Sequence, residues 1–152
     1  MSKKIITLAL CALFSLVFAV AATGCSRDEE TAQLDENNPI SVFIHENRDI
    51  LEEASQDHLE DLGPGSTVDF LAEDGEFIYA YSFGPGPTVD ELKEYATEFL
   101  EYPSNISMYE ELANNIAILA EVDSLTLSVR YYDGQGEFIT SRSYESKLGL
   151  SD

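Results

Sequence analysis

Apolar positions recur at regular spacing from about residue 39 onward and divide this part of the chain into predicted helices and strands. Between Ile40 and Leu62 they return every three or four positions, which predicts an amphipathic helix. Asn38-Pro39 precedes this run and supplies an N-cap followed by a proline at the first helical position. Gly63-Pro64-Gly65 follows the run, so we expect the helix to end there.

Alternation of apolar and polar residues predicts two β-hairpins. The first joins residues 68–72 to residues 77–83 through a turn that contains Asp74-Gly75, a strong hairpin signal. The second joins residues 125–132 to residues 138–144 through a turn with two glycines.

Two capping-box motifs lie between the hairpins. Thr88 and Glu91 have the spacing of a helix N-cap and its third residue, and they predict a second helix that ends before Pro103. Ser107 and Glu110 repeat the spacing and predict the start of a third helix. Apolar stripes at helical spacing follow both motifs.

The order of helix, hairpin, helices and hairpin predicts an α+β domain. We expect a four-stranded antiparallel sheet with two to three helices packed on one face, because this arrangement buries the apolar stripes. The tripeptide at residues 76–78 recurs at residues 137–139, each time after a glycine and within a hairpin. The sequence leaves open whether this reflects an internal duplication of a helix and a hairpin.

The repeat also bears on which face of the sheet is open. It aligns Tyr79 and Tyr81 with Thr140 and Arg142, and an arginine is rarely fully buried without a partner. We therefore expect these tyrosines to point away from the helices. Tyrosine and arginine are frequent in interface hot spots, so this face is the candidate binding surface. Its residues are Tyr79, Tyr81, Arg130, Tyr132 and Arg142.

Two other interpretations of the aromatic residues remain open. The tyrosines could be cross-strand pairs that protect an exposed sheet, with the arginines paired to Asp69 or Glu73. Alternatively, the faces could be reversed, so that the aromatic residues form the core.

The first 24 residues have the organisation of a signal peptide. Lys3 and Lys4 precede an uncharged run over residues 5–23, which ends in small residues. The Gly24-Cys25 pair at the boundary resembles a bacterial lipobox, which implies cleavage between the two residues and lipidation of Cys25. The alternative is an uncleaved helical anchor, because 19 uncharged residues nearly suffice to span a bilayer.

Cleavage at this point would leave three parts with different tasks. Lipid on Cys25 attaches the chain to the membrane, residues 25–38 form a flexible acidic tether, and residues 39–152 form one domain. The mature chain keeps six basic residues against 29 acidic ones, a net charge of about −23 with neutral histidines. Such a charge argues against nucleic acid as a partner, because it repels phosphate backbones.

The domain carries no recognisable catalytic, cofactor or metal motif. His45 and His58 are 13 residues apart on the first predicted helix, so they do not share a turn, and His58 falls on the apolar stripe. No cysteine remains after Cys25, and the adjacent acidic pairs diverge on a helix. We therefore expect a protein that is not an enzyme and needs no cofactor.

The two hairpin sequences, over residues 68–83 and 125–144, resemble those of a family of small lipoproteins from Gram-positive bacteria that share a domain of unknown function. The resemblance implies a location on the outer face of the cell membrane and supplies no catalytic residue. The leading hypothesis is a binding module for an envelope protein or peptide. The alternative is an inhibitor or modulator of an envelope protease.

Overall fold

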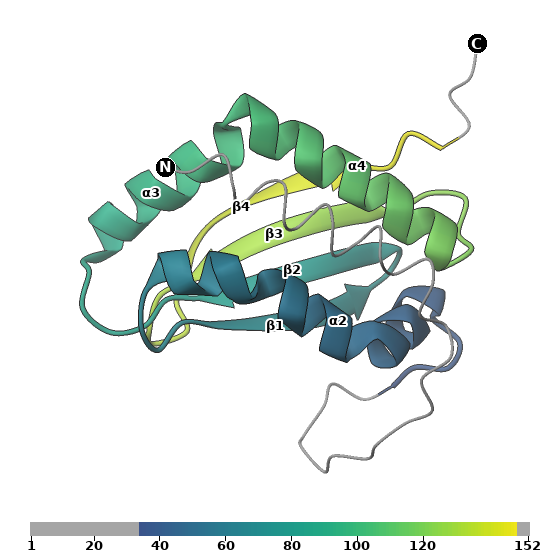
Figure 1. Ribbon diagram of the computed structural model, residues 1–152, viewed down its shortest axis with the longest axis horizontal. Coiled ribbons are helices and arrows are strands. Elements are labelled where there is room, and N and C mark those ends of the chain that lie inside the picture. The colour runs from purple at the N-terminus through teal and green to yellow at the C-terminus, as the bar shows by residue number, and fades with distance from the viewer. Residues whose placement is uncertain (1–33, 149–152) are drawn as a thin grey trace.

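The computed structural model describes residues 34–148 and has three helices on one face of a four-stranded sheet (Figure 1). The predicted α+β class, the two hairpins and the single helical layer are confirmed. The predicted signal peptide, cleavage site and lipidation at Cys25 lie outside the described residues. The elements are α2 (Pro39–Leu62), β1 (Thr67–Glu73), β2 (Glu76–Ser82), α3 (Val89–Glu101), α4 (Pro103–Leu119), β3 (Thr126–Tyr132) and β4 (Phe138–Glu145).

The sheet is mixed, so the prediction of an entirely antiparallel sheet is wrong. The strands follow the order β1-β2-β3-β4, and the central pair, β2 and β3, is parallel. The reason is the path of α3 and α4, which run head to tail along the length of the sheet (Figure 1). The chain therefore returns to the end at which β2 began, and β3 runs in the same direction as β2.

The connection between α3 and α4 is much tighter than the sequence predicts. Tyr102 alone separates the two helices, because α4 begins at Pro103 and not at Ser107. The Ser107 hydroxyl donates to the Pro103 carbonyl at 3.2 Å and does not cap the helix. The buried Asn105 side chain donates to the Phe99 carbonyl at 2.9 Å and ties the two helices together.

The other two predicted helix starts are confirmed. The Asn38 side chain accepts hydrogen bonds from the backbone N–H groups of Ile40 and Ser41 at the start of α2. Thr88 and Glu91 form a complete capping box at the start of α3. These contacts satisfy N–H groups that a helix leaves unpaired in its first turn.

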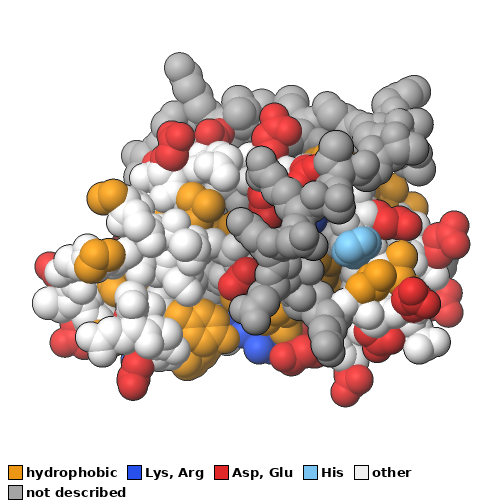
Figure 2. All heavy atoms as spheres, turned by 90° about the horizontal axis from the view of Figure 1, so that it is seen from below, with side chains coloured by type: hydrophobic (Ala, Val, Ile, Leu, Met, Phe, Trp, Pro, Cys, Tyr) orange, Lys and Arg blue, Asp and Glu red, His pale blue; other side chains and the backbone are white. Residues whose placement is uncertain are grey.

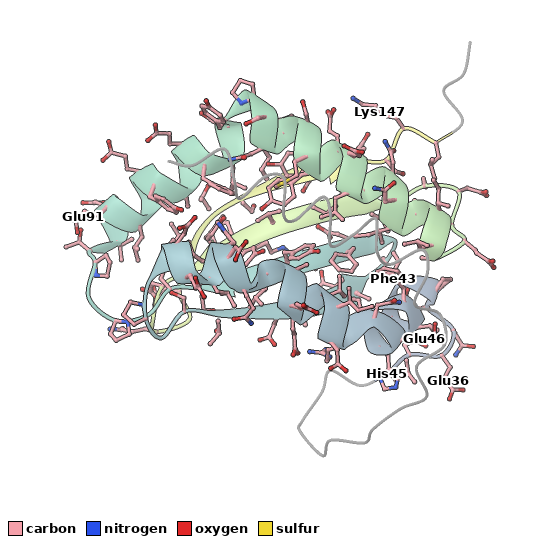
Figure 3. The ribbon with its side chains drawn as sticks, in the orientation of Figure 1. Glu36, Phe43, His45, Glu46, Glu91 and Lys147 are labelled. Atoms are coloured by element: carbon pink, nitrogen blue, oxygen red, sulfur yellow. The ribbon has the colours of Figure 1, made fainter. Side chains whose placement is uncertain are left out.

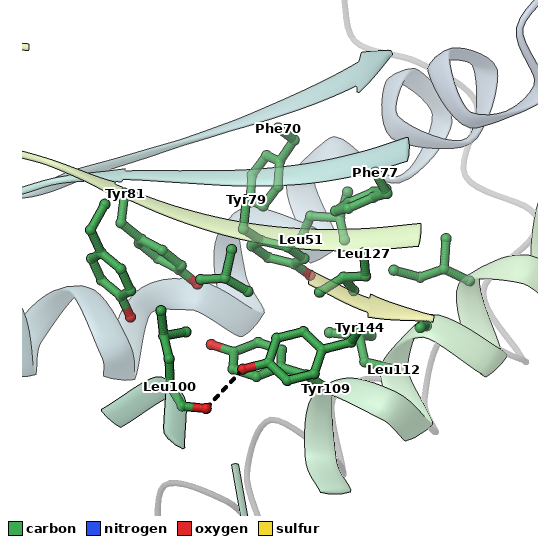
Figure 4. Packing of buried hydrophobic residues seen from close by; sticks show 14 of the residues in the cluster. Leu51, Phe70, Phe77, Tyr79, Tyr81, Leu100, Tyr109, Leu112, Leu127 and Tyr144 are labelled. Atoms are coloured by element: carbon green, nitrogen blue, oxygen red, sulfur yellow. Dashed lines mark hydrogen bonds between the residues drawn. The ribbon is translucent and has the colours of Figure 1, made fainter. Parts of the chain in front are cut away.

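Aromatic side chains fill the space between the sheet and the helices (Figure 4). Tyr81 stacks on Tyr131 across β2 and β3, with ring centroids 5.4 Å apart. On β4, Tyr144 stacks on Tyr109 of α4, and its hydroxyl donates to the Leu100 carbonyl at 3.1 Å. The core thus joins both hairpins to the helical layer.

Three glycine-containing loops meet at one end of the sheet. A Cβ atom on Gly84 would lie 2.0 Å from the Pro64 carbonyl oxygen, so no larger residue fits there without a shift of the backbone. A Cβ on Gly134 would lie 3.2 Å from the Phe83 carbonyl oxygen, a milder conflict. Direct backbone packing therefore closes this end of the domain.

The topology gives no support to an internal duplication. Seen from the helical side, the second strand of each hairpin lies on the same side of its first strand. The two first strands, β1 and β3, nevertheless run in opposite directions. A rotation that keeps the helices on the same side of the sheet therefore cannot superpose β1 on β3 and, at the same time, β2 on β4. Duplication therefore stays a prediction that the fold does not confirm.

Within residues 34–148, no helix combines the length and the apolar character that crossing a bilayer requires.

Candidate functional site

The face of the sheet opposite the helices, called the helix-free face here, is defined by the alternation along β3. Leu127, Val129 and Tyr131 are fully buried towards the helices, so the residues between them project from the other side. The strand register adds side chains from β1, β2 and β4 to this face. Its polar and aromatic residues include Glu73, Glu76, Ser128, Arg130, Tyr132, Phe138, Ser141 and Ser143.

The prediction that Tyr79 and Tyr81 lie on the open face is wrong. Their side chains are only 5% and 3% exposed, and both belong to the core between the sheet and the helices. Tyr79 contacts Phe70 at 5.2 Å between ring centroids, and Tyr81 contacts the ring of His58 at 4.7 Å. For Tyr79 and Tyr81, the interpretation in which the aromatic residues form the core is therefore correct.

The position of Arg142 explains why the prediction for Tyr79 and Tyr81 is wrong. It pairs with Val129 and therefore lies on the helix-covered side, where its guanidinium carbon is 5.7 Å from the centre of the Tyr144 ring. Because β4 is the last strand of the sheet, a long side chain there can reach solvent from the covered face. An arginine at a sheet edge consequently does not identify the open face.

Arg130 and Tyr132 do lie on the helix-free face, as predicted. The Arg130 Nη2 atom is 3.3 Å from both carboxylate oxygens of Glu76 and 3.6 Å from Glu73. Burial alone would lower the pKa of Arg130, but the Tyr132 side chain and the two carboxylates outweigh this effect and raise the pKa. The guanidinium is therefore a fixed positive charge on this face.

A chain of hydroxyl contacts extends from this ion pair to the edge of the sheet. Ser128 on β3 donates to Glu76, because a carboxylate can only accept. Its only proton is thereby used, so Ser143 on β4 must donate to Ser128 across 2.7 Å. Polar contacts thus connect β2, β3 and β4 and hold the Glu76 carboxylate in place.

The Arg130 side chain also extends along β2 past an apolar residue of the helix-free face. In the register, Arg130 is opposite Ala80, whereas its partner Glu76 lies four residues further back on β2. Ile78 is between these two positions and is 0% exposed, although it does not belong to the core on the helical side. The ion pair therefore spans Ile78, an apolar position of this face that adjoins Leu71 on β1.

An aromatic pair of one exposed and one half-buried residue lies at one end of the same face. The rings of Tyr132 and Phe138 are in edge-to-face contact at 6.0 Å, and Phe138 is 58% exposed. The register shift at Tyr132 places Phe138 opposite it and Thr140 opposite Tyr131, which leaves Ile139 as the extra residue. The sequence-based prediction does not include Phe138; regular alternation groups it with Thr140 and Arg142, whereas the bulge places it on the opposite face from them.

The buried His58 on α2 is the most perturbed histidine, on the opposite side of the sheet. Its Nε2 atom is 2.7 Å from the Tyr131 hydroxyl, its ring stacks on Phe99 at 4.5 Å, and its Nδ1 atom has no hydrogen-bond partner among the described residues. Burial lowers its pKa from 6.5 to about 4. His58 is therefore neutral near pH 7 and has the environment of a core residue, as its position on the apolar stripe indicates.

Among residues 34–148, no three histidine, cysteine or acidic side chains come together as metal ligands would. Comparison of the chain with family models, curated proteins and solved structures yields no match. The resemblance to Gram-positive lipoproteins consequently stays a prediction from the sequence.

Proposed function

We propose that this protein is a lipid-anchored binding module on the outer face of a bacterial membrane, and that its helix-free face contacts an envelope protein or peptide. The observation that carries the proposal is the exposed Phe138, in contact with the half-buried Tyr132, beside the fixed charge of Arg130. Aromatic and arginine side chains contribute strongly to protein interfaces, because they combine apolar area with directed hydrogen bonds.

The location of this surface favours recognition of a macromolecule. None of the three described helices covers it, and Ser141 and Ser143 on the neighbouring strand are exposed as well (Figure 1). A partner could contact the aromatic pair, the arginine and these hydroxyl groups at once. The proposed surface replaces Tyr79, Tyr81 and Arg142 of the sequence-based prediction with Phe138, Ser141 and Ser143.

The anchoring part of the proposal rests on the sequence. Lipid on Cys25 holds the chain at the membrane, and residues 25–38 separate the domain from the lipid surface. The net charge of the full chain is −21, which repels anionic lipid and keeps the domain away from the bilayer. We propose no catalytic role and no cofactor.

Affinity purification from envelope extracts tests the binding role. We expect the full chain to retain a defined partner, and Phe138→Ser to lose it. Ile118→Ser is the matched control, because Ile118 is 59% exposed on α4, on the other side of the molecule. Equal loss of the partner with both variants would contradict the proposal. A retained protease that loses activity on binding would favour the inhibitor hypothesis for the same surface.

A further inference from the structure

A groove separates the first half of α2 from β1. It encloses about 190 Å³, and its helical wall contains Ser41, His45 and Arg48, which lie on one side of α2. Its floor includes Phe70 and Ala72 of β1. Small-molecule sites enclose roughly 300–1,000 Å³, so this groove suits one or two side chains of a longer ligand better than a whole small molecule.

The free edge of β1 lies along this groove. β1 is the first strand of the sheet and pairs only with β2 within the described part of the chain. Half of the N–H and C=O groups of such an edge strand point outward without a strand partner. An extended peptide satisfies such groups by adding a further strand, and the neighbouring helix then contacts its side chains.

The two ends of the groove carry charges of opposite sign. α2 and β1 run in opposite directions, so the start of α2 lies beside the end of β1 (Figure 1). Asp35 and Glu73 line the end near the β1–β2 turn, and Arg48 lies about two and a half helical turns after the start of α2. Figure 3 shows His45 on the outer side of α2 near the first of these ends.

The ion pairs that Arg48 and Glu73 already form leave both charged groups available to contact a ligand. Arg48 is 3.7 Å from Glu52 within α2, and Glu73 is 3.6 Å from Arg130, so neither contact is short. Arg48 is also one of only five lysine and arginine residues between residues 34 and 148. Acidic side chains predominate over basic ones on the side of the molecule seen in Figure 2. A positive charge inside a groove on such a surface favours a carboxylate at that position.

We propose that this groove binds an extended peptide segment of a partner protein as a fifth strand, antiparallel to β1. In this orientation the amino end of the segment lies beside Asp35 and Glu73 and carries a basic residue. Its carboxyl end lies beside Arg48 and carries an acidic residue. Apart from Glu73, which lies at the rim of both, the residues named for this site do not belong to the helix-free face, so the inference does not depend on the function proposed above.

A pair of synthetic peptides tests this inference with the full chain in nonionic detergent. The first has eight residues of alternating valine and threonine character, with lysine near the amino end and glutamate near the carboxyl end. The second exchanges the lysine and the glutamate. Backbone amide shifts of the labelled protein report the site, and titration gives the dissociation constant.

We expect the first peptide to bind more tightly and to shift amides of β1 and of the first half of α2. Arg48→Ala should weaken its binding about threefold, as for loss of one partly exposed charge contact. Arg142→Ala is the matched control on the opposite edge of the sheet and should leave the affinity unchanged.

Three results would overturn the inference. One is the absence of saturable shifts at millimolar peptide, and another is tighter binding of the exchanged peptide. The third is binding that appears only after removal of the residues before Leu34, since the chain itself would then be the occupant of the groove.

Discussion

His58 shows how one buried side chain can make the stability of the domain depend on pH. The residues that contact its ring, Tyr81, Phe99 and Tyr131, are uncharged, so no carboxylate compensates a proton on His58. Its pKa is 6.5 in the unfolded chain and about 4 in the folded chain, so the unfolded state binds more protons between these values. The contribution to stability is complete above pH 6.5 and is lost as the pH falls towards 4.

Replacement of His58 should therefore remove part of the acid sensitivity. Between pH 7 and pH 4.5 the titration of His58 lowers the free energy of unfolding by roughly 2 kcal/mol. Urea unfolding of His58→Gln should lack this component, even if the variant is less stable at every pH. His45→Gln, which removes the exposed histidine, is the matched control variant. The same pH dependence in both variants would contradict this account of His58.

Gly84 is a second residue whose role depends on its surroundings. Gly84→Ala places a methyl group 2.0 Å from the Pro64 carbonyl oxygen, so the loops must separate. We expect a loss of about 2–4 kcal/mol in the free energy of unfolding, the range of severe steric substitutions. Gly134→Ala, whose nearest contact is 3.2 Å, should lose clearly less. Thermal and urea unfolding measure both, and equal losses would contradict the tight packing of these loops.

At the scale of elements, the head-to-tail arrangement of α3 and α4 determines the topology. With Tyr102 as the only residue between them, the two helices carry the chain along the whole sheet and make β2 and β3 parallel. A pair of helices folded back on itself would return the chain to the other end and produce the antiparallel sheet predicted from the sequence. The tight connection at Tyr102 and Pro103 thus determines the relative directions of β2 and β3.

The two capping-box motifs provide a direct test of these helix boundaries. Thr88→Ala should cost about 1 kcal/mol, because the Thr88 side chain accepts from the Glu91 N–H at the true start of α3. Ser107→Ala should be nearly neutral, because Ser107 lies inside α4 and its hydroxyl only bonds back to Pro103. Urea unfolding compares the two variants. A larger cost at Ser107 than at Thr88 would show that α4 begins later.

Local signals in the sequence were sufficient for the elements but not for their pairing or their faces. The Asn38 cap, the Thr88 capping box and the Asp74-Gly75 turn are short-range features, and each predicts its element correctly. The direction of β3 depends on a helix pair that precedes it, and the position of Arg142 depends on which strand forms the edge. Alternation separates two faces without saying which one the helices cover, so Tyr79 and Tyr81 were assigned to the wrong side.

At the scale of the whole molecule, the proposal joins an anchor, an acidic tether and a binding domain. The two cysteines of the chain separate the anchor hypothesis from its alternative. Cys25→Ala should abolish incorporation of labelled palmitate and processing sensitive to globomycin, whereas Cys11→Ala should leave both unchanged, since Cys11 lies within the predicted signal peptide. Palmitate labelling of both variants in a bacterial host measures this. Unchanged labelling of Cys25→Ala would contradict lipidation at that residue.

Site-specific photocrosslinking in living cells tests the central claim, recognition through the helix-free face, most directly. A photoreactive amino acid replaces Phe138 on this face or Ile118 on α4, two positions of nearly equal exposure at 58% and 59%. We expect a discrete crosslinked partner from position 138 and none from position 118. A discrete product from position 118 alone, or the same product from both positions, would contradict the proposed binding surface.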